Sequence, residues 1–318
     1  MPHKVIFDTD PGVDDATALL LLHRHPAIEL VGITTVFGNA DADGTARNAL
    51  HLAARFGITC PVARGAARAL DGHAGHPPTF VHGENGLGDV DLSGVPLGPL
   101  AEVTAPQLII DLVRAHPGEI TLLAVGRMTN LAIALLLAPD IAGLVKQVVI
   151  MGGAFGLGGN NGNVTPVAEA NIIGDPMAAD IVFGASWKVV AIGLDVTRQV
   201  VVTPDDVEAL AASDDAGAQF IAAISRFYMG YYSRSGVNGF FVHDSSAAAY
   251  VIDPGLFETR AGPVRVATDG VARGQTIQRD PDIHYPPGAW DDRPNQSICS
   301  SVDAPAVKAL LMDALFGR

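Results

Sequence analysis

The sequence is poor in cysteine, in basic residues and in long apolar runs. Its 318 residues include 2 cysteines, Cys60 and Cys299, which provide no disulfide framework and are consistent with a reducing compartment. Asp and Glu number 34 against 20 Lys and Arg, a formal net charge of −14 that argues against nucleic acid and anionic membrane surfaces as partners. The longest apolar run, Leu131–Ala138, is far too short to span a bilayer.

A targeting segment and a dinucleotide-binding fingerprint are also missing. The first strand-like run starts almost at the first residue and leaves no room for a signal peptide, so we expect a soluble, cytoplasmic protein. The Gly-rich stretch 152–159 contains no G-x-G-x-x-G spacing, and asparagines follow it instead of a helix start. We therefore exclude a nicotinamide or flavin site.

The sequence does contain an alternation of apolar strands and helical patterns. The expected strands are Val5–Phe7, Leu30–Val36, Ile120–Ala124, Val145–Met151 and Lys188–Gly193, and the expected helices are Ala16–Arg24, Gly44–Phe56, Pro106–Ala115, Asn130–Leu137, Ser245–Tyr250 and Pro305–Phe316. This alternation predicts an α/β fold with an open, mostly parallel, Rossmann-like sheet flanked by helices. We expect a single domain over residues 1–318, a long loop at Leu70–Leu97, and an active site at the carboxyl ends of the strands.

Four carboxylates lie within eight positions directly after the first strand, at Asp8, Asp10, Asp14 and Asp15. Carboxylates this close repel one another and are costly unless a positive group lies among them. The segment itself contains no Lys or Arg, so a bound hard cation is the economical explanation. Two alternatives explain less. A helix N-cap role accounts for Asp14 alone, and an aspartyl-nucleophile phosphatase using Asp8 leaves Asp14 and Asp15 without a role.

Polar residues also follow other apolar segments. Asn39 follows the second strand, Glu169 and Asn171 stand in an apolar neighbourhood after the fourth, and His243 and Asp244 precede a helix of small residues. Each has a structural alternative, because Asn after Gly is common in turns and a His–Asp pair can be structural. Together with the acid cluster they favour a functional site, since unpaired buried polar groups are expensive.

The chain resembles the nucleoside hydrolase family, of the inosine–uridine-preferring type. The motifs that carry the resemblance, in the family's order, are Asp8–Ala16 (DTDPGVDDA), Val36–Asn39 (VFGN), His82–Leu87 (HGENGL), Gly126–Ala132 (GRMTNLA), Asn163–Asn171 (NVTPVAEAN) and Val242–Asp244 (VHD). The resemblance implies Ca²⁺-dependent hydrolysis of the N-glycosidic bond of a small-molecule ribonucleoside to ribose and free base, as in nucleoside salvage. It also implies a homodimer or homotetramer.

The resemblance implies a role for each residue of the predicted site. Ca²⁺ would be held by Asp10, Asp15, Asp244 and the backbone carbonyl of Val125, with the ribose 2′- and 3′-hydroxyls completing its shell; the sugar would contact Asp14, Asn39, Asn163, Glu169 and Asn171; and His82, on a mobile loop, would lie near the base. Asp10 would take a proton from metal-bound water, and His243 would protonate the departing base. The chemistry agrees, because cleavage builds positive charge on the ribosyl ring, which carboxylates stabilise.

The chain departs from the family pattern at three places. Arg127-Met128 stands where Pro-Leu is common, Ala170 where an aromatic residue is common, and Ser245 where proline is usual. None of these departures removes a functional group from the proposed chemistry.

The sequence indicates the preferred base less directly than the reaction. Tyr231 lies twelve residues before His243, where broad-specificity members of the family similarly place a tyrosine. The purine-specific branch relies on tryptophans around the base, and this chain has only two tryptophans, Trp187 and Trp290. We therefore expect inosine and uridine as substrates. A pyrimidine-preferring hydrolase remains an alternative, as does a non-catalytic nucleoside- or sugar-binding protein, which would need neither Asp10 nor His243.

Overall fold

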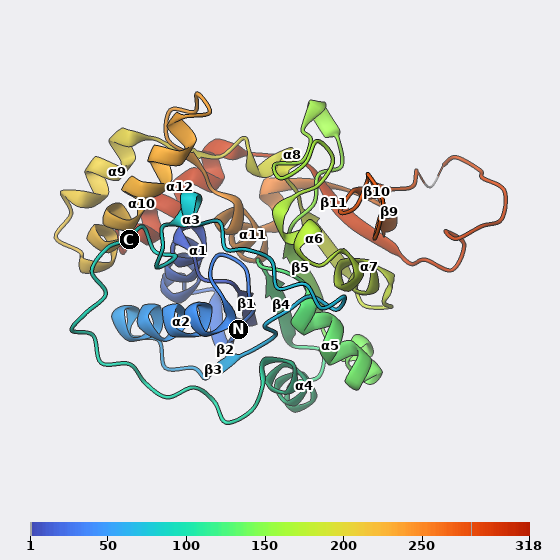
Figure 1. The fold of residues 1–318 in the computed structure, drawn as a ribbon, viewed down its shortest axis with the longest axis horizontal. Coiled ribbons are helices and arrows are strands. Elements are labelled where there is room, and N and C mark those ends of the chain that lie inside the picture. The colour runs from blue at the N-terminus through green and yellow to red at the C-terminus, as the bar shows by residue number, and fades with distance from the viewer. Residues whose placement is uncertain (1, 281) are drawn as a thin grey trace.

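The centre of the molecule is a large, mostly parallel β-sheet. The computed structural model describes residues 2–280 and 282–318, and within them a nine-stranded sheet has the order β10-β9-β11-β6-β5-β4-β1-β2-β3 (Figure 1). Its strands are β1 (His3–Thr9), β2 (Ile28–Thr35), β3 (Val62–Arg64), β4 (Ile120–Ala124), β5 (Gln147–Met151), β6 (Val189–Ile192), β9 (Phe257–Val266), β10 (Thr276–Gln278) and β11 (Asn295–Val302). The strands from β11 to β3 pair in parallel, and β9 and β10 extend the sheet as an antiparallel edge. The short strands β7 (Val201–Val202) and β8 (Phe240–Phe241) pair with each other.

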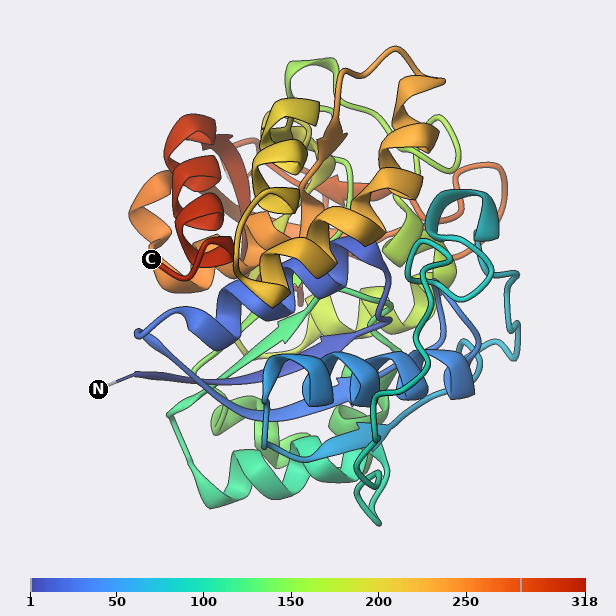
Figure 2. The same cartoon turned by 90° about the vertical axis from the view of Figure 1, so that its left-hand side faces the viewer.

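Helices cover both faces of the sheet, and Figure 2 shows the strands between the two layers. They are α1 (Val13–Arg24), α2 (Ala42–Phe56), α3 (Thr79–His82), α4 (Ala105–Ala115), α5 (Thr129–Leu137), α6 (Ala170–Gly174), α7 (Pro176–Gly184), α8 (Leu194–Thr197), α9 (Pro204–Ala211), α10 (Ala216–Ser233), α11 (His243–Ile252) and α12 (Ala304–Leu315), with 3₁₀ turns at Pro139–Gly143, Leu157–Gly159 and Pro254–Leu256. Val5 and Phe7 of β1 point into a core shared with α1, α2, α10, α11 and α12, whereas Ile6 points into a second core with α4, α5 and α7. Burial on both faces explains why the central strands are almost continuously apolar.

The predicted α/β fold class is confirmed, and the structure contains every strand and helix expected above, with ends shifted by a few residues. The sequence patterns did not reveal β3, β9, β10 or β11. Of these, β9 and β10 form the antiparallel edge, where β9 has a mostly exposed first half. The predicted long loop is part of the connection between β3 and α4, and it contains the single-turn helix α3.

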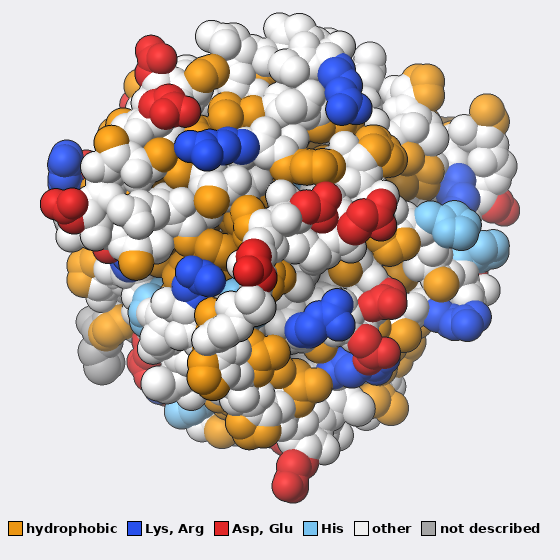
Figure 3. All heavy atoms as spheres, turned by 60° about the vertical axis from the view of Figure 1, so that its left-hand side comes forward, with side chains coloured by type: hydrophobic (Ala, Val, Ile, Leu, Met, Phe, Trp, Pro, Cys, Tyr) orange, Lys and Arg blue, Asp and Glu red, His pale blue; other side chains and the backbone are white. Residues whose placement is uncertain are grey.

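The parallel strands bring their carboxyl ends to one edge of the sheet. The acid-rich turn follows β1, Asn39 follows β2, Val125 follows β4 and the Gly-rich stretch follows β5, so segments far apart in sequence meet there. No helix in the described part of the chain is both long and apolar enough to cross a bilayer. On the face drawn in Figure 3, acidic and basic side chains are interspersed and form no large patch of one sign.

Candidate active site

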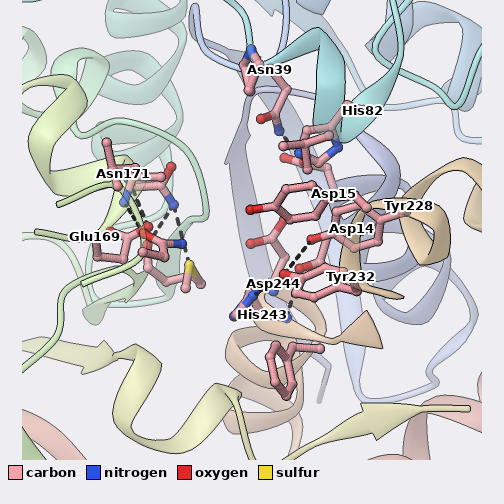
Figure 4. Close-up of a pocket in the computed structure, with 18 of the residues that line it drawn as sticks. Asp14, Asp15, Asn39, His82, Glu169, Asn171, Tyr228, Tyr232, His243 and Asp244 are labelled. Carbon is pink, nitrogen blue, oxygen red and sulfur yellow. Dashed lines mark hydrogen bonds between the residues drawn. The ribbon is translucent and has the colours of Figure 1, made fainter. Parts of the chain in front are cut away.

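A cavity of about 780 Å³ opens at this edge of the sheet. Every residue of the predicted site lines it: Asp10, Asp14, Asp15, Asn39, His82, Val125, Asn163, Glu169, Asn171, Tyr231, His243 and Asp244. Figure 4 shows Glu169 and Asn171 on one wall, facing Asp14, Asp15, His243 and Asp244 across the cavity. The fold therefore brings together side chains that are spread over more than two hundred residues of sequence.

The turn after β1 holds Asp10 and Asp15 in fixed positions. Asp15 accepts hydrogen bonds from Thr9 Oγ1 (2.5 Å), Gly12 N (2.9 Å) and Asn39 Nδ2 (3.1 Å). Asp10 Oδ2 accepts one from the backbone N–H of Asn39 at 2.9 Å. Room for the Asp10 carboxylate depends on Gly38, where an added Cβ would lie 1.8 Å from Oδ2. A side chain there would displace the carboxylate.

Asp14 connects the acid-rich turn to α11. Its Oδ2 accepts hydrogen bonds from the backbone N–H groups of His243 (2.8 Å) and Asp244 (3.1 Å), the first two residues of that helix. Asp14 thus caps a distant helix, and the alternative in which it caps its own helix is wrong, because residue 12 occupies the N-cap of α1. The other oxygen, Oδ1, is buried and has no hydrogen-bond partner among the described residues. A buried oxygen left in this way requires a ligand or a hydroxyl group to satisfy it.

Burial and mutual repulsion perturb the carboxylates. Burial, followed by the charge of Asp15, holds the pKa of Asp10 well above its usual range, and burial raises the pKa of Asp14 to about 7. The pKa of Asp244 is also well above its usual range, because the group is buried and then because Asp14, Asp15 and Asp10 are near. The cavity therefore has a strong affinity for positive charge, supplied either by protons or by a cation.

The oxygen donors of the buried carboxylates suit a hard cation. Asp10, Asp15 and Asp244 are 4%, 1% and 5% exposed, offer oxygen atoms only, and lie beside the unpartnered Asp14 Oδ1. In the described ranges, however, no three His, Cys, Asp or Glu side chains are gathered closely enough to form a metal centre by themselves. A bound cation would therefore need additional oxygen donors, which carbonyl and hydroxyl groups can supply.

The opposite wall is built around Glu169. Its carboxylate accepts hydrogen bonds from the backbone N–H groups of Asn171 (2.9 Å), Gly153 (3.1 Å) and residue 172 (3.2 Å), so it caps α6 and fixes the Gly-rich stretch. Asn171 Nδ2 donates to the carbonyl of Val125 at 2.7 Å, which leaves that oxygen one free lone pair. Asn163 Oδ1 accepts from the backbone N–H of residue 170 at 3.0 Å. This wall presents amide and carboxylate groups to a polyhydroxylated ligand.

Histidines and tyrosines form the remaining side of the cavity. His243 contacts Thr197 Oγ1 through Nδ1 (2.7 Å) and Tyr232 Oη through Nε2 (2.9 Å). His82 accepts a hydrogen bond from the backbone N–H of residue 13 at 3.2 Å and stacks on Tyr228, with ring centroids 5.1 Å apart. Burial lowers the pKa of both His82 and His243 to about 3, so both rings are neutral. Flat apolar faces with a few polar atoms suit an aromatic heterocycle.

Asp8 lies outside this cavity. Its side chain is completely buried, and Oδ2 accepts hydrogen bonds from Thr34 Oγ1 (2.6 Å) and Asn130 Nδ2 (2.8 Å). Burial raises the pKa of this carboxyl to about 7. A nucleophile so enclosed has no access to substrate, which argues against the phosphatase alternative.

Several residues of the site were not identified from the sequence. Thr197, Tyr232, Tyr228 and Arg198 contact His243 or His82 or line the cavity, and Arg127 lies behind it with its guanidinium 4.3 Å from the ring of Phe37. The Arg127 charge acts on Asp10 and Glu169, so the acids have a cation near them that their own segment lacks. The Tyr-rich helix before His243 indicated Tyr231 only weakly, and no feature of the sequence distinguished Tyr231 from the neighbouring tyrosines. Thr197 and Arg198 occur in a segment with no distinctive pattern, and Arg127 was noted only as a departure within the Gly126–Ala132 motif.

Comparisons with known proteins agree on one family. A sequence model described as inosine-uridine preferring nucleoside hydrolase matches residues 5–309. The chain is 40% identical over 316 residues to a probable uridine nucleosidase 2 of Arabidopsis thaliana, covering 98% of this chain and 97% of that protein. It is 43% identical over 284 residues to an inosine-uridine preferring nucleoside hydrolase of Crithidia fasciculata, covering 87% and 88%. The fold is similar to that of a solved plant nucleoside hydrolase, with a TM-score of 0.96, 36% identity and 100% of both chains covered.

Proposed function

Because the chain belongs to the inosine-uridine preferring nucleoside hydrolase family and is a ribonucleoside N-ribohydrolase, we propose that it cleaves uridine and inosine with the help of Ca²⁺. One observation carries the assignment of residues. Asp10, Asp14, Asp15 and Asp244 converge on one cavity with His243, so groups that stabilise a positive sugar and a group that protonates a base face the same space.

The ribose is proposed to bind on the side of the cavity where the carboxylates lie. Asp14 Oδ1, Asn39, Asn163, Glu169 and Asn171 would bind the ribose hydroxyls, and the unpartnered state of Asp14 Oδ1 supports this role. Asp10, Asp15, Asp244 and the Val125 carbonyl would hold Ca²⁺. When bound, the cation would anchor the vicinal hydroxyls and make a nearby water more acidic.

In the proposed reaction the C1′–N bond breaks and its electron pair leaves with the base. The oxygen of a water molecule bonds to C1′, and one proton of that water passes to the Asp10 carboxylate. Solvent supplies a proton to the base by way of His243, and the proton taken up by Asp10 returns to solvent, so that ribose and neutral base are the products. The place of Asp10 in the cavity lining, together with Asp15 and Asp244, supports its use as a proton acceptor.

The base end is proposed to lie between His82, Tyr228, Tyr231 and His243. One relative is named a uridine nucleosidase and another an inosine-uridine preferring hydrolase, which supports these two substrates. Ala170, which stands where an aromatic residue is common, gives the cavity wall a small side chain at that point. A pyrimidine-preferring enzyme is the runner-up. By family membership we also propose a homodimer or homotetramer, which sedimentation equilibrium would test.

Ribose release from a panel of nucleosides tests the proposed function. We expect turnover of uridine and inosine, with adenosine, guanosine and cytidine slower. We expect weak turnover of 2′-deoxyinosine, because it lacks one of the two hydroxyls that the site binds. Turnover of pyrimidine nucleosides alone would establish the runner-up. Binding of nucleosides without any ribose release would instead support a non-catalytic protein.

Thr197 offers a test of the role of His243. Thr197→Val keeps the side-chain shape but removes the hydroxyl from His243 Nδ1, so we expect kcat/KM for uridine to fall about 10- to 100-fold. The rate on 4-nitrophenyl riboside should change little, because its phenolate leaves without a proton. Thr197→Ser is the control and should retain most activity. An equal loss on both substrates would show that Thr197 only supports the fold.

A further inference from the structure

A single basic residue lies inside the acidic cavity. Among the described residues that line it, Arg198 is the only Lys or Arg, in a chain with a formal net charge of −14. Arg127, the other cation near the site, is not part of the lining. Arg198 is half-buried, and a cation that lines the cavity without pairing with one of its carboxylates requires an explanation.

The guanidinium of Arg198 makes few direct contacts with the rest of the protein, although its charge acts on Asp195. Its one side-chain hydrogen bond to the described residues is a long contact of 3.4 Å from Nη2 to the carbonyl of Gly162. It forms no ion pair with any carboxylate in the described ranges, whereas Arg24, Arg265 and Arg293 each do. Donors of the Arg198 fork therefore remain available to a ligand.

Arg198 lies on the side of the cavity that protonates the base. It directly follows Thr197, which contacts His243 Nδ1 at 2.7 Å, and its charge acts on both His243 and Tyr232. The carboxylates Asp10 and Glu169, by contrast, are influenced mainly by Arg127 among the cations. The two arginines thus serve different parts of the site.

Cleavage of an N-glycosidic bond separates charge in a defined direction. The ribosyl ring becomes positive while the departing base becomes negative, until the base receives its proton. Carboxylates complement the first charge, and a fixed cation complements the second. We propose that Arg198 is a further catalytic residue, whose guanidinium stabilises the negative charge on the departing base.

The proposal predicts a dependence on the base. A uracil anion places charge on its two carbonyl oxygens, which planar N–H donors bind well. The more acidic the base, the less it needs this help. This inference rests on the proposed function, because a departing base exists only if the N-glycosidic bond is broken.

The experiment compares uridine with 5-fluorouridine, which differs by one small atom and releases a more acidic base. For Arg198→Gln we expect kcat/KM on uridine to fall about 100-fold. The fall on 5-fluorouridine should be several times smaller, so the ratio of the two rates rises. Arg198→Lys should recover part of the loss. Arg226→Gln, which removes an exposed arginine outside the cavity lining, is the matched control and should leave both rates unchanged.

The outcomes separate the two proposals. If the wild-type protein releases no ribose from any nucleoside, the proposed function fails. If the wild type is active but Arg198→Gln loses the same factor on both substrates, or loses nothing, the catalytic role of Arg198 is overturned. Thermal unfolding of all three arginine variants, expected to match the wild type, excludes a loss caused by misfolding.

Discussion

Replacing Asp10 by Asn is expected to lower kcat/KM for uridine by about 1000-fold or more, while the protein remains folded. The proposed proton acceptor is lost, and general bases contribute about 10²- to 10⁴-fold to rates. The variant is nearly isosteric, and its amide oxygen can still accept the hydrogen bond from the Asn39 N–H. Without added cation, its melting temperature should equal or exceed that of the wild type, because one of several repelling carboxylates is gone.

Steady-state kinetics and thermal unfolding measure both effects. Asp8→Asn is the matched control, since Asp8 is also buried and acidic but does not line the cavity. We expect the rate of Asp8→Asn to stay within about tenfold of the wild-type rate, because the substitution changes buried hydrogen bonds and no group that contacts the reacting atoms. Undiminished turnover in Asp10→Asn would refute the role given to Asp10. Abolished turnover in Asp8→Asn alone would revive the nucleophile alternative.

We expect EGTA, which removes divalent cations, to abolish ribose release, and added Ca²⁺ to restore it. The oxygen-only donor set and the unpartnered Asp14 Oδ1 support a bound hard cation, which would relieve the repulsion among the carboxylates. Calcium at about 100 times its dissociation constant stabilises the folded state by about 2.7 kcal/mol, which corresponds to a rise in melting temperature of about 4 °C for a chain of this size.

Metal analysis of the EGTA-treated protein and a titration followed by melting temperature supply readouts independent of activity. Asp244→Asn should lose most of the stabilisation by Ca²⁺, since a charged ligand becomes neutral. Asp269→Asn, an exposed acid outside the cavity lining, should retain it. Full activity in protein shown to be free of metal would contradict the proposal. Restoration by Mg²⁺ and not by Ca²⁺ would change the identity of the ion.

The parallel part of the fold was predictable because burial on both faces leaves a simple pattern. Strands such as Ile120–Ala124 are buried at every position and apolar except at Thr121, so length and neighbouring helical patterns identify them. The carboxyl-terminal strands lack this pattern. β11 reads NQSICSSV, and most of the first half of β9 is exposed, so polar residues there conceal the strands. Their pairing depends on distant partners, which a local pattern does not show.

The site was predictable where residues cluster in sequence, and less so where only the fold collects them. The DTDPGVDDA segment can be identified as part of a site from the sequence, because four acids in a short stretch need a shared explanation. Thr197 and Arg198 look ordinary in sequence, and Arg127 was noticed only as a departure from the family pattern. The importance of all three arises from which strand ends lie side by side. The choice among neighbouring tyrosines also depends on helix rotation, and the structure places Tyr232, rather than Tyr231, against His243.

The link between Asp14 and the start of α11 also bears on how the protein folds. The hydrogen bond from Asp244 N to Asp14 spans 230 positions of the chain, so forming it carries the entropic cost of closing a long loop. During synthesis the acid-rich turn emerges long before α11, and its carboxylates can stay hydrated until that helix arrives. Because α11 is also part of the core, the same packing step that completes the core brings His243 and Asp244 to the pocket.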